Sequence, residues 1–290
     1  MFEEILFPTD GSAGATAAFD YVLDVAATHD ATVHLLHVAD TTRSAVGGQE
    51  DVVGALERRG QQIVDEAAER ARERGVATHT DVLRGDPYRV VSDYAASADV
   101  DVIVMPTRGR RGLARFLLGS TTERVVRRSD VPVLTLKPDG ASDFDYPFEN
   151  VLVATDGSDC ARAALEAGVG VADEAGAALH LLSVVDVTSL GVDARIAMEV
   201  FEESANRIVA ESAAFATDAG VDTVSESVEF GSSVSGVVRS YVRAHDVDLV
   251  VVGTHGRTGF DRYVLGSVAE SLVRTSSVPV LTVREPTDDE

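Results

Sequence analysis

Three of the four glycines in one polar loop of this sequence, and the serine that ends it, stand at a distinctive spacing. Residues 253–267 read GTHGRTGFDRYVLGS after the apolar run VDLVVV, so that two residues separate Gly253 from Gly256 and nine separate Gly256 from Gly266, which Ser267 follows. Glycine lets the main chain approach a ligand closely. A helical pattern follows Ser267, and the N–H groups at the start of a helix can bind phosphate without a lysine. The loop is neither a Walker A motif nor a dinucleotide fingerprint, because it lacks their Gly-Lys pair and GxGxxG spacing.

The elements that must position this loop alternate between strands and helices. In the first half of the chain, apolar runs predict strands at 5–9, 31–38, 76–83, 100–105 and 131–136, and Ala-rich or amphipathic segments predict helices at 10–30, 54–75, 86–97 and 120–129. This alternation predicts an α/β fold with an open, mostly parallel sheet and helices on both faces. Such sheets bind ligands at the carboxyl ends of their strands, where the strand order reverses.

The whole pattern of strands, helices and loops occurs twice in the sequence. FEEILFPTDGS recurs as FENVLVATDGS, HLLHVAD as HLLSVVD, VDVIVMPTRGRRGLARFLLGS as VDLVVVGTHGRTGFDRYVLGS, and SDVPVLTLK as SSVPVLTVR. Four blocks in the same order at a nearly constant offset indicate a tandem duplication. We therefore predict a first domain at 1–138, a polar linker at 139–147 and a second domain at 148–290.

The offset between the copies locates one inserted residue. Asp156 follows Asp10 by 146 residues, whereas Gly266 follows Gly119 by 147. The landmarks between these points place the extra residue of the second copy between Gly231 and the tyrosine at 241.

In each copy, the loops after the first and fourth strands and the end of the second strand are expected to converge at one edge of the sheet.

These motifs resemble the universal stress protein family, in its ATP-binding class and tandem two-domain form. The resemblance covers essentially the whole chain apart from the linker, and residues 253–267 match the family's phosphate signature in full. It implies two tandem, open, mostly parallel five-stranded sheets of the Rossmann-like, adenine-nucleotide alpha-hydrolase-like type. It also implies ATP as the ligand, with Mg²⁺, and an internal pseudo-dimer of the two domains that pairs their last strands. Association of two whole chains into a homodimer is left open.

Carried over residue by residue, the resemblance implies a nucleotide site in each copy. In the second copy, Asp156 would lie near the ribose and phosphates and Val184 would meet the adenine through its backbone. The signature glycines and the start of the following helix would hold the phosphates, through Gly253, Gly256, Gly266, Ser267 and Val268. The corresponding residues of the first copy are Asp10, Val38, Gly109, Gly119 and Ser120.

The first copy departs from this pattern at one position. Pro106 stands where the signature has its first glycine. Proline has no N–H group and a fixed φ, so a main-chain donor is lost there. A lost phosphate contact costs roughly 1.5–3 kcal/mol, on the order of ten- to a hundredfold in affinity. Arg108 and Arg111 could offset part of this loss by contacting phosphate directly. We predict that the second site binds ATP more tightly than the first.

The charge of the chain excludes several other classes of function. Among 290 residues, 48 are acidic and 25 basic, for a formal net charge of −23, and Lys137 is the only lysine. This excess argues against general nucleic-acid binding, and it resembles the composition of proteins from salt-loving archaea.

We expect no membrane span, because no apolar run approaches the required ~18–20 residues. We expect a cytoplasmic protein, because the N-terminus does not read as a signal peptide.

Several residues have plainer interpretations. Asp10 and Asp156 could serve as helix N-caps, alone or together with a ligand role. His34 and His180 stand mid-strand beside apolar residues and are interpreted as structural, and a reactive role for Cys160 is not expected. The run GVGVADEAG at 168–176 falls inside a predicted helix, so its glycines are interpreted as packing residues and not as a dinucleotide motif.

Two classes of function remain, with a weaker third. The first is a stress-response regulator whose shape or partners depend on bound ATP. The second is an interaction scaffold that no longer uses nucleotide. The third is a slow ATPase, because efficient phosphoryl transfer needs a positioned base or water that no motif supplies. No catalytic residue and no protein-built metal site is predicted. The stress signal, the downstream protein partner and the preference among ATP, AMP and cyclic nucleotides stay open.

Overall fold

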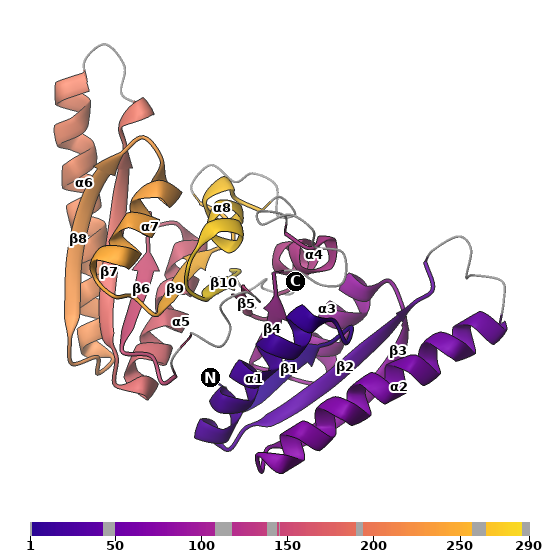
Figure 1. Cartoon of the computed structure of the whole chain (residues 1–290). Helices are drawn as coiled ribbons and strands as arrows, with labels where there is room; N and C mark the ends of the chain where they lie inside the picture. The colour runs from indigo at the N-terminus through magenta and orange to yellow at the C-terminus, as the bar shows by residue number, and fades with distance from the viewer. Residues whose placement is uncertain are drawn as a thin grey trace. The chain divides into compact units, whose positions relative to one another are not determined.

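The computed structural model describes residues 2–42, 50–107, 118–137, 144, 146–189, 194–256 and 265–285. It divides into two compact units, Met1–Tyr146 and Pro147–Glu290, which we call domain 1 and domain 2 (Figure 1). Within domain 1, the rings of Phe144 and Tyr146 pack edge-on against that of Tyr21. The residues that join the two repeats thus contribute apolar contacts to domain 1.

Domain 1 contains five strands and four helices in its described residues. The strands are β1 (Glu4–Pro8), β2 (Thr32–Asp40), β3 (Ala77–Gly85), β4 (Val102–Pro106) and β5 (Val133–Leu136). The helices are α1 (Ala13–His29), α2 (Glu50–Glu73), α3 (Pro87–Ser97) and α4 (Ser120–Arg128). The strands lie in the order β3-β2-β1-β4-β5, and each neighbouring pair is parallel.

Domain 2 repeats this arrangement. Its strands are β6 (Asn150–Ala154), β7 (Ala178–Asp186), β8 (Val224–Gly231), β9 (Leu249–Gly253) and β10 (Val280–Val283). Its helices are α5 (Asp159–Ala175), α6 (Ala194–Asp218), α7 (Val234–Ala244) and α8 (Ser267–Thr275), with a short 3₁₀ turn at Val187–Ser189. The strand order is β10-β9-β6-β7-β8, again parallel throughout.

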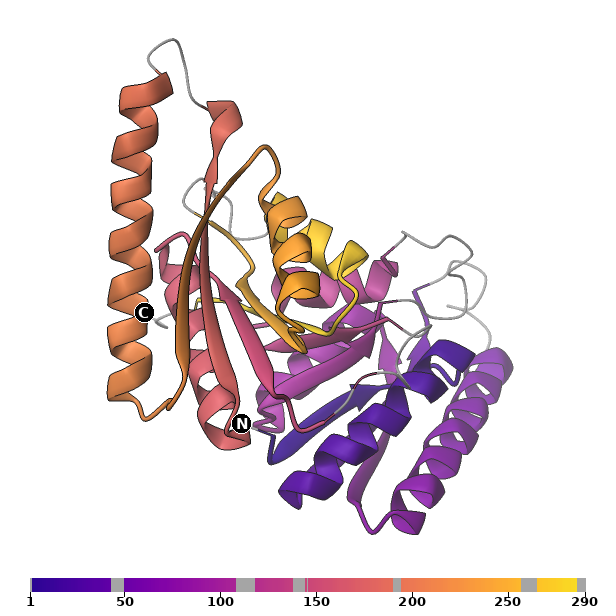
Figure 2. The same cartoon turned by 60° about the vertical axis from the view of Figure 1, so that its left-hand side comes forward.

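The connections place helices on both faces of each sheet. Parallel strands are joined by right-handed crossovers. In domain 1, α1 and α2 therefore cover one face of the sheet, and α3 and α4 cover the other (Figures 1 and 2). In domain 2, α5 and α6 are separated from α7 and α8 in the same way. The first strand of each domain lies between the second and the fourth, where the strand order reverses. Its apolar residues, such as Leu6 and Leu152, are fully buried. The predicted fold class is therefore confirmed, and the reversal point marks where the site is expected.

The inserted residue of the second copy lies in the connection before α7. In domain 1 the N-cap of α3, Asp86, directly follows the end of β3 at Gly85. In domain 2 the N-cap of α7 is Ser233, two residues after Gly231 at the end of β8. Ser232 is thus the extra residue, as the sequence offset predicted.

The glycines of GVGVADEAG lie in helix α5, which packs on the sheet of domain 2. Gly168 is buried, and a β-carbon there would overlap Cγ2 of Val153 and lie 3.6 Å from Cγ2 of Val251. Gly170, two residues later, is exposed, and a β-carbon there would have no neighbour within 4 Å. Gly168 therefore lets α5 approach the strands closely, which confirms the packing interpretation for this glycine. The same interpretation is wrong for the exposed Gly170.

Two alanine substitutions in this helix are expected to have opposite effects. Gly168→Ala should destabilise domain 2 by about 2 kcal/mol, because overpacking against buried strands outweighs the gain of about 1 kcal/mol in helix propensity. Gly170→Ala should stabilise it by up to about 1 kcal/mol, since only propensity changes. Urea unfolding of the two variants measures both values. Equal effects at the two positions would contradict the close packing of α5.

His34 and His180 are buried in equivalent hydrogen-bonded clusters. His34 shares hydrogen bonds with Tyr94 Oη (3.0 Å) and Glu4 Oε2 (2.8 Å). His180 shares them with Tyr241 Oη (3.2 Å) and Asn150 Oδ1 (3.3 Å). These contacts link strands to α3 or α7, which supports a structural role for both histidines.

The His180 cluster is expected to make domain 2 sensitive to acid. Burial, with a smaller contribution from nearby His245, lowers the pKa of His180 below its ordinary value. As the pH falls below about 6.5, the unfolded chain takes up a proton at this residue before the native chain does, so native stability falls. We expect His180→Gln to lose less stability than the wild type between pH 7.5 and 5.5, as measured by urea unfolding. An equal loss in both proteins would assign the acid sensitivity to other groups.

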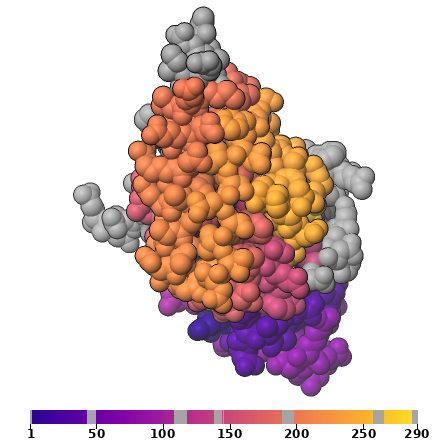
Figure 3. Space-filling model, turned by 90° about the vertical axis from the view of Figure 1, so that its left-hand side faces the viewer, coloured from indigo at the N-terminus to yellow at the C-terminus, as the bar shows by residue number. Residues whose placement is uncertain are grey.

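Helix α6 forms much of the outer surface of domain 2 (Figure 3). Three of its apolar side chains, Val200, Phe201 and Phe215, are exposed. Across the described ranges, no helix combines the length and the hydropathy needed to cross a bilayer.

Candidate functional site

A tight turn at the end of β6 fixes Asp156. Its Oδ1 accepts a hydrogen bond from the N–H of Ser158 (3.0 Å), while Ser158 Oγ accepts one from the N–H of Ala161 (3.3 Å). Ser158 is therefore the N-cap of α5, and Asp156 shapes the turn before it. The interpretation of Asp156 as the helix cap is wrong, because the serine two residues later performs that role.

The turn of domain 1 has the same construction. Asp10 Oδ1 accepts from the N–H of Ser12 (2.9 Å), and Ser12 Oγ accepts from the N–H of Ala15 (3.2 Å). Here, too, serine is the cap of the helix and the aspartate is not. In both domains, one carboxylate oxygen is thus used to hold the turn at the end of the central strand.

The glycine loop brings its first residues against Asp156. A β-carbon at Gly256 would lie 2.7 Å from Oδ2 of Asp156, so any side chain there would displace the carboxylate. The far end of the loop returns to the same edge, because the N–H of Gly266 donates to the carbonyl oxygen of Thr254 (2.8 Å). The end of β9, the carboxylate and the start of α8 are therefore close together.

Helix α8 begins at this edge with a glycine cap. Its N-cap is Gly266, which has no side chain to accept from the first-turn N–H groups of a helix that starts at Ser267. A β-carbon at Gly266 would lie 3.1 Å from the carbonyl oxygen of Thr254, which explains why the smallest residue stands there. Val268 is half-buried in the same turn. An uncapped helix N-terminus favours an anionic ligand.

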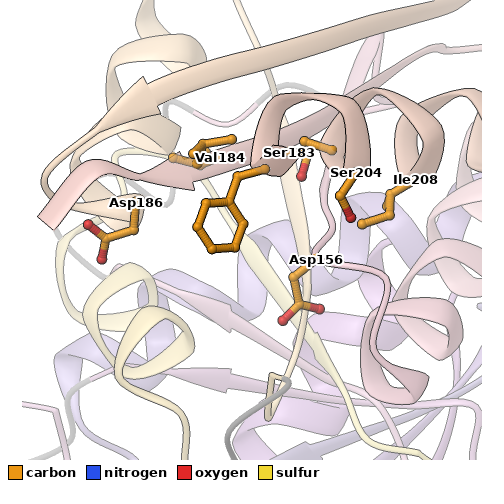
Figure 4. Close-up of a pocket in the computed structure, with 9 residues that line it drawn as sticks. Asp156, Ser183, Val184, Asp186, Ser204 and Ile208 are labelled. Atoms are coloured by element: carbon orange, nitrogen blue, oxygen red, sulfur yellow. The ribbon is translucent and has the colours of Figure 1, made fainter. Parts of the chain in front are cut away.

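A pocket of about 150 Å³ opens beside Asp156 (Figure 4). It lies between the end of β7 and one face of α6, with Asp156 across from Ser204 and Ile208. Its lining consists of Asp156, Ser183, Val184, Val185, Asp186, Phe201, Ser204, Ala205 and Ile208. Ligand pockets for drug-sized molecules span about 300–1,000 Å³, so this one suits a single ring system and not a whole nucleotide.

The wall supplied by α6 was not anticipated from the sequence. It consists of Phe201, Ser204, Ala205 and Ile208, which share one helical face at the spacing i, i+3, i+4, i+7. This spacing is visible in the sequence, but it does not show which ligand the face contacts. Phe201 is 44% exposed, so a large aromatic surface is available at the pocket.

A second carboxylate lies at the pocket. Asp186 Oδ1 accepts hydrogen bonds from the hydroxyl (2.7 Å) and N–H (2.9 Å) of Thr188. These bonds lower the pKa of the half-buried Asp186 carboxyl below its ordinary value, so it is ionised at neutral pH. Within the ranges that the structure describes, no three His, Cys, Asp or Glu side chains are grouped so as to hold a metal ion.

Gly253 has a packing role that its place in the signature did not reveal. It ends β9, and a β-carbon there would lie 2.8 Å from the carbonyl carbon and oxygen of Cys160, in the first turn of α5. In the first copy, Pro106 replaces this glycine and Gly14 replaces Cys160. That Gly253 also contacts a ligand remains a prediction. That Pro106 weakens the binding of nucleotide in domain 1 remains one as well.

The predicted residues of domain 1 occupy corresponding places. Asp10 follows β1, Val38 lies near the end of β2, and α4 begins at Ser120 after its N-cap Gly119. The N–H of Gly119 donates to the carbonyl oxygen of Thr107 (2.8 Å), as Gly266 does to Thr254 in domain 2. The predicted positions 108, 109 and 111 lie outside the described residues.

Comparison with known proteins gives a consistent result. A model of the universal stress protein family matches residues 1–137 and again 147–284. A universal stress protein of Methanocaldococcus jannaschii is 35% identical over 141 residues, covering 47% of this chain and 83% of its own. One of Mycolicibacterium smegmatis is 29% identical over 296 residues, covering 97% and 96%. The crystal structure of a universal stress protein from Archaeoglobus fulgidus superposes with a TM-score of 0.73 at 25% identity, covering 98% of each chain.

Proposed function

This chain belongs to the universal stress protein family, and from that premise we propose that it is a regulator of the stress response whose state depends on ATP bound in domain 2. The observation that carries the proposal is the convergence of three features at one sheet edge. These are a pocket of base size, the carboxylate of Asp156 and the uncapped start of α8. Each suits a different part of an adenine nucleotide.

The pocket supplies the base site of the proposed complex. Its walls combine Val184 near the end of β7 with Phe201 and Ile208 of α6. A purine ring is planar and aromatic, so it gains from stacking and from apolar burial against such walls. Hydrogen bonds from the base would go to the main chain at the end of β7, as the resemblance implied for Val184.

The ribose and phosphates would lie between Asp156 and the glycine loop. Asp156 would accept hydrogen bonds from the ribose, while the N–H groups of Gly256, Gly266, Ser267 and Val268 would face the phosphates. The position of Gly256 directly against Asp156 supports this division. Domain 1 presents Asp10, Val38, Gly119 and Ser120 at equivalent places and would be the weaker site.

Mg²⁺ would enter with the phosphates and would be held largely by them. Asp156 and Asp186 place negative charge beside the pocket, and the chain carries a formal net charge of −23. A divalent cation would screen the phosphates from this charge. We further propose a cytoplasmic, high-salt setting, because about 1 M salt shortens the Debye length to about 3 Å and relieves the self-repulsion.

The test is a calorimetric titration of ATP with Mg²⁺ into the nucleotide-stripped full chain in molar KCl, comparing Asp156→Ala with Asp10→Ala. Both substitutions remove the same type of turn hydrogen bond, so each should cost about 1 kcal/mol of stability. Only Asp156→Ala should also weaken the tight site, by about 1.5–3 kcal/mol, which is about ten- to a hundredfold.

Two results would contradict the proposal. No heat from the wild type, together with no nucleotide carried through purification, would favour the nucleotide-independent scaffold. Tight binding that is weakened by Asp10→Ala and untouched by Asp156→Ala would move the functional site to domain 1. Thermal unfolding of both variants checks that their losses of stability match.

A further inference from the structure

Helices α5 and α6 of domain 2 approach each other near their C-terminal ends. A β-carbon at Gly220, two residues after the end of α6, would lie 3.4 Å from Oδ1 of Asp173 in α5. Glu166, Gly170 and Asp173 share one face of α5, at the helical spacing i, i+4, i+7, and all three are exposed. This face of α5 therefore borders the end of α6, whose last turn carries Phe215.

In domain 1, the equivalent surface carries ion pairs. Nη2 of Arg70 lies 2.6 Å from Oδ1 of Asp20, and Nη1 of Arg74 lies 2.5 Å from Oδ1 of Asp24. The guanidinium carbon of Arg70 also lies 5.4 Å from the centroid of the Phe19 ring. Charged side chains thus link α1 to the end of α2 on the outside of domain 1.

The aligned residues of domain 2 cannot form these ion pairs, because ERARERGV aligns with AFATDAGV and FDYVLD with LEAGVG. Both arginines and one of the two aspartates are replaced by uncharged residues, which are Phe215, Ala219 and Gly170. Phe215 is 42% exposed, and the other two are exposed as well. Glycine weakens a helix, and a β-carbon at Gly170 would have no described neighbour within 4 Å, so packing inside domain 2 does not explain this glycine.

Acidic side chains border this uncharged surface. On α6, Glu211 and Asp218 stand four residues before and three residues after Phe215, so they lie on the same side of the helix. On α5, Glu166 and Asp173 flank Gly170. All four acidic residues are exposed. We call the whole set the α5/α6 face, which consists of Glu166, Gly170, Asp173, Glu211, Phe215, Asp218 and Ala219.

The charge of this face indicates what it can bind. In a symmetric dimer the same residues of two copies meet, so a second copy of this chain would bring the acidic border against itself. A basic partner gains attraction at the same border. Exposed aromatic side chains are enriched in the centres of interfaces, and an amphipathic helix binds a surface of this kind with its apolar side. A helix with apolar residues on one side and lysine or arginine beside them therefore complements the α5/α6 face.

We propose that the α5/α6 face binds a basic amphipathic helix of another protein. The apolar side of that helix covers Phe215, and its lysine or arginine side chains lie beside Glu166 and Asp218. Gly170 and Ala219 have little or no side chain, so they let the backbone of the bound helix approach closely. The proposal does not depend on nucleotide binding, because none of these residues lines the pocket beside Asp156.

The test is a titration of the full chain into a labelled peptide of leucine and lysine, about 14 residues or four turns long, whose leucines recur at the spacing of an amphipathic helix. Fluorescence anisotropy in molar KCl measures the affinity, and the salt suppresses unspecific attraction to the acidic chain. We expect one peptide per chain. Phe215→Arg should weaken binding by about tenfold or more, because it removes the central aromatic side chain.

Val200→Arg is the matched control. Val200 is 59% exposed on the same helix, so this variant makes the same change of charge at another exposed apolar position. It should bind the peptide within about twofold of the wild type. A triple variant, Phe215→Arg/Gly170→Asp/Ala219→Arg, introduces the ion-pairing residue types of domain 1 and should abolish binding. Thermal unfolding shows that each variant is folded.

The inference would be overturned by any of the following results. The wild type does not bind the leucine and lysine peptide, or Phe215→Arg and Val200→Arg bind it equally. A peptide of leucine and glutamate with the same spacing, expected to bind at least about tenfold more weakly, binds as tightly. Light scattering shows that the wild type self-associates and that Phe215→Arg abolishes this, which would assign the face to a second copy. If Phe215→Arg does not fold, unchanged binding by the folded variant Gly170→Asp/Ala219→Arg overturns the inference.

Discussion

Gly256→Val is expected to lower the affinity of domain 2 for ATP by more than about a hundredfold while the domain stays folded. The new side chain would begin 2.7 Å from Oδ2 of Asp156, in the place where the carboxylate now lies. Displacing Asp156 would remove its proposed contact with the ribose, and the valine would also obstruct the approach of the phosphates to the loop. Two lost hydrogen bonds to charged groups, at about 1.5–3 kcal/mol each, account for the size of the effect.

The domain should tolerate this substitution for two reasons. The nearest atom is the end of a side chain that can rotate away, and Gly256 is not among the described glycines with a positive φ, so no backbone strain is added. Calorimetry with ATP measures the affinity, and urea unfolding measures the stability. A folded variant that binds within about threefold of the wild type would show that the loop does not approach the nucleotide.

Gly253→Ala is expected to act on folding, with a loss of about 3 kcal/mol. Its β-carbon would lie 2.8 Å from the carbonyl carbon and oxygen of Cys160. These are main-chain atoms in the first turn of α5, so they cannot rotate aside, and relief requires the helix to shift. Overpacking of this kind costs about 1–3 kcal/mol, and the rigid neighbours place it at the upper end. Urea unfolding measures the change.

The contrast between the two glycines is the informative result. Gly170→Ala, in the helix that Gly253 contacts but facing solvent, provides the benign reference for an added methyl group. If Gly253→Ala kept its stability and instead lost ATP, Gly253 would act at the phosphates and the packing explanation would fail. If both properties were unchanged, neither role would hold.

Much of the fold could be predicted because its signals are local and repeated. Apolar runs such as 249–253 mark strands that are buried on both faces, and the duplication let each copy check the other. The reversal of strand order predicted that the TDGS turn and the glycine loop lie at the same edge of the sheet. The helical conformation of GVGVADEAG could be predicted because the run lies inside a capped helical segment, before the next apolar strand.

The parts that escaped prediction depend on contacts between distant segments. Phe201 belongs to a helix that meets the end of β7 only in the folded domain, so its helical spacing showed a face without showing its partner. The division of labour between Asp156 and Ser158 at the turn depends on which oxygen reaches which N–H group. His37 in β2 and Gly60 in α2 are far apart in sequence, but a β-carbon at Gly60 would overlap Cδ2 of His37, a fit that is visible only when strand and helix are packed. The pairing of the last strands between domains remains a prediction.

One exchange between the copies, His37 with Gly60 in domain 1 against Ser183 with Ala205 in domain 2, has an evolutionary consequence. His37 aligns with Ser183 in HLLHV and HLLSV, and Gly60 aligns with Ala205 in GQQIV and ANRIV. A β-carbon at Gly60 would overlap Cδ2 of His37. Duplicated segments within one gene are open to gene conversion, which overwrites part of one copy with the other. A tract that carried His37 into the second copy without Gly60 would place an imidazole against the β-carbon of Ala205, a contact that the geometry of domain 1 excludes. Such half-exchanged genes would encode strained proteins. A conversion tract would therefore have to carry both residues of the pair to leave the packing of the recipient domain intact.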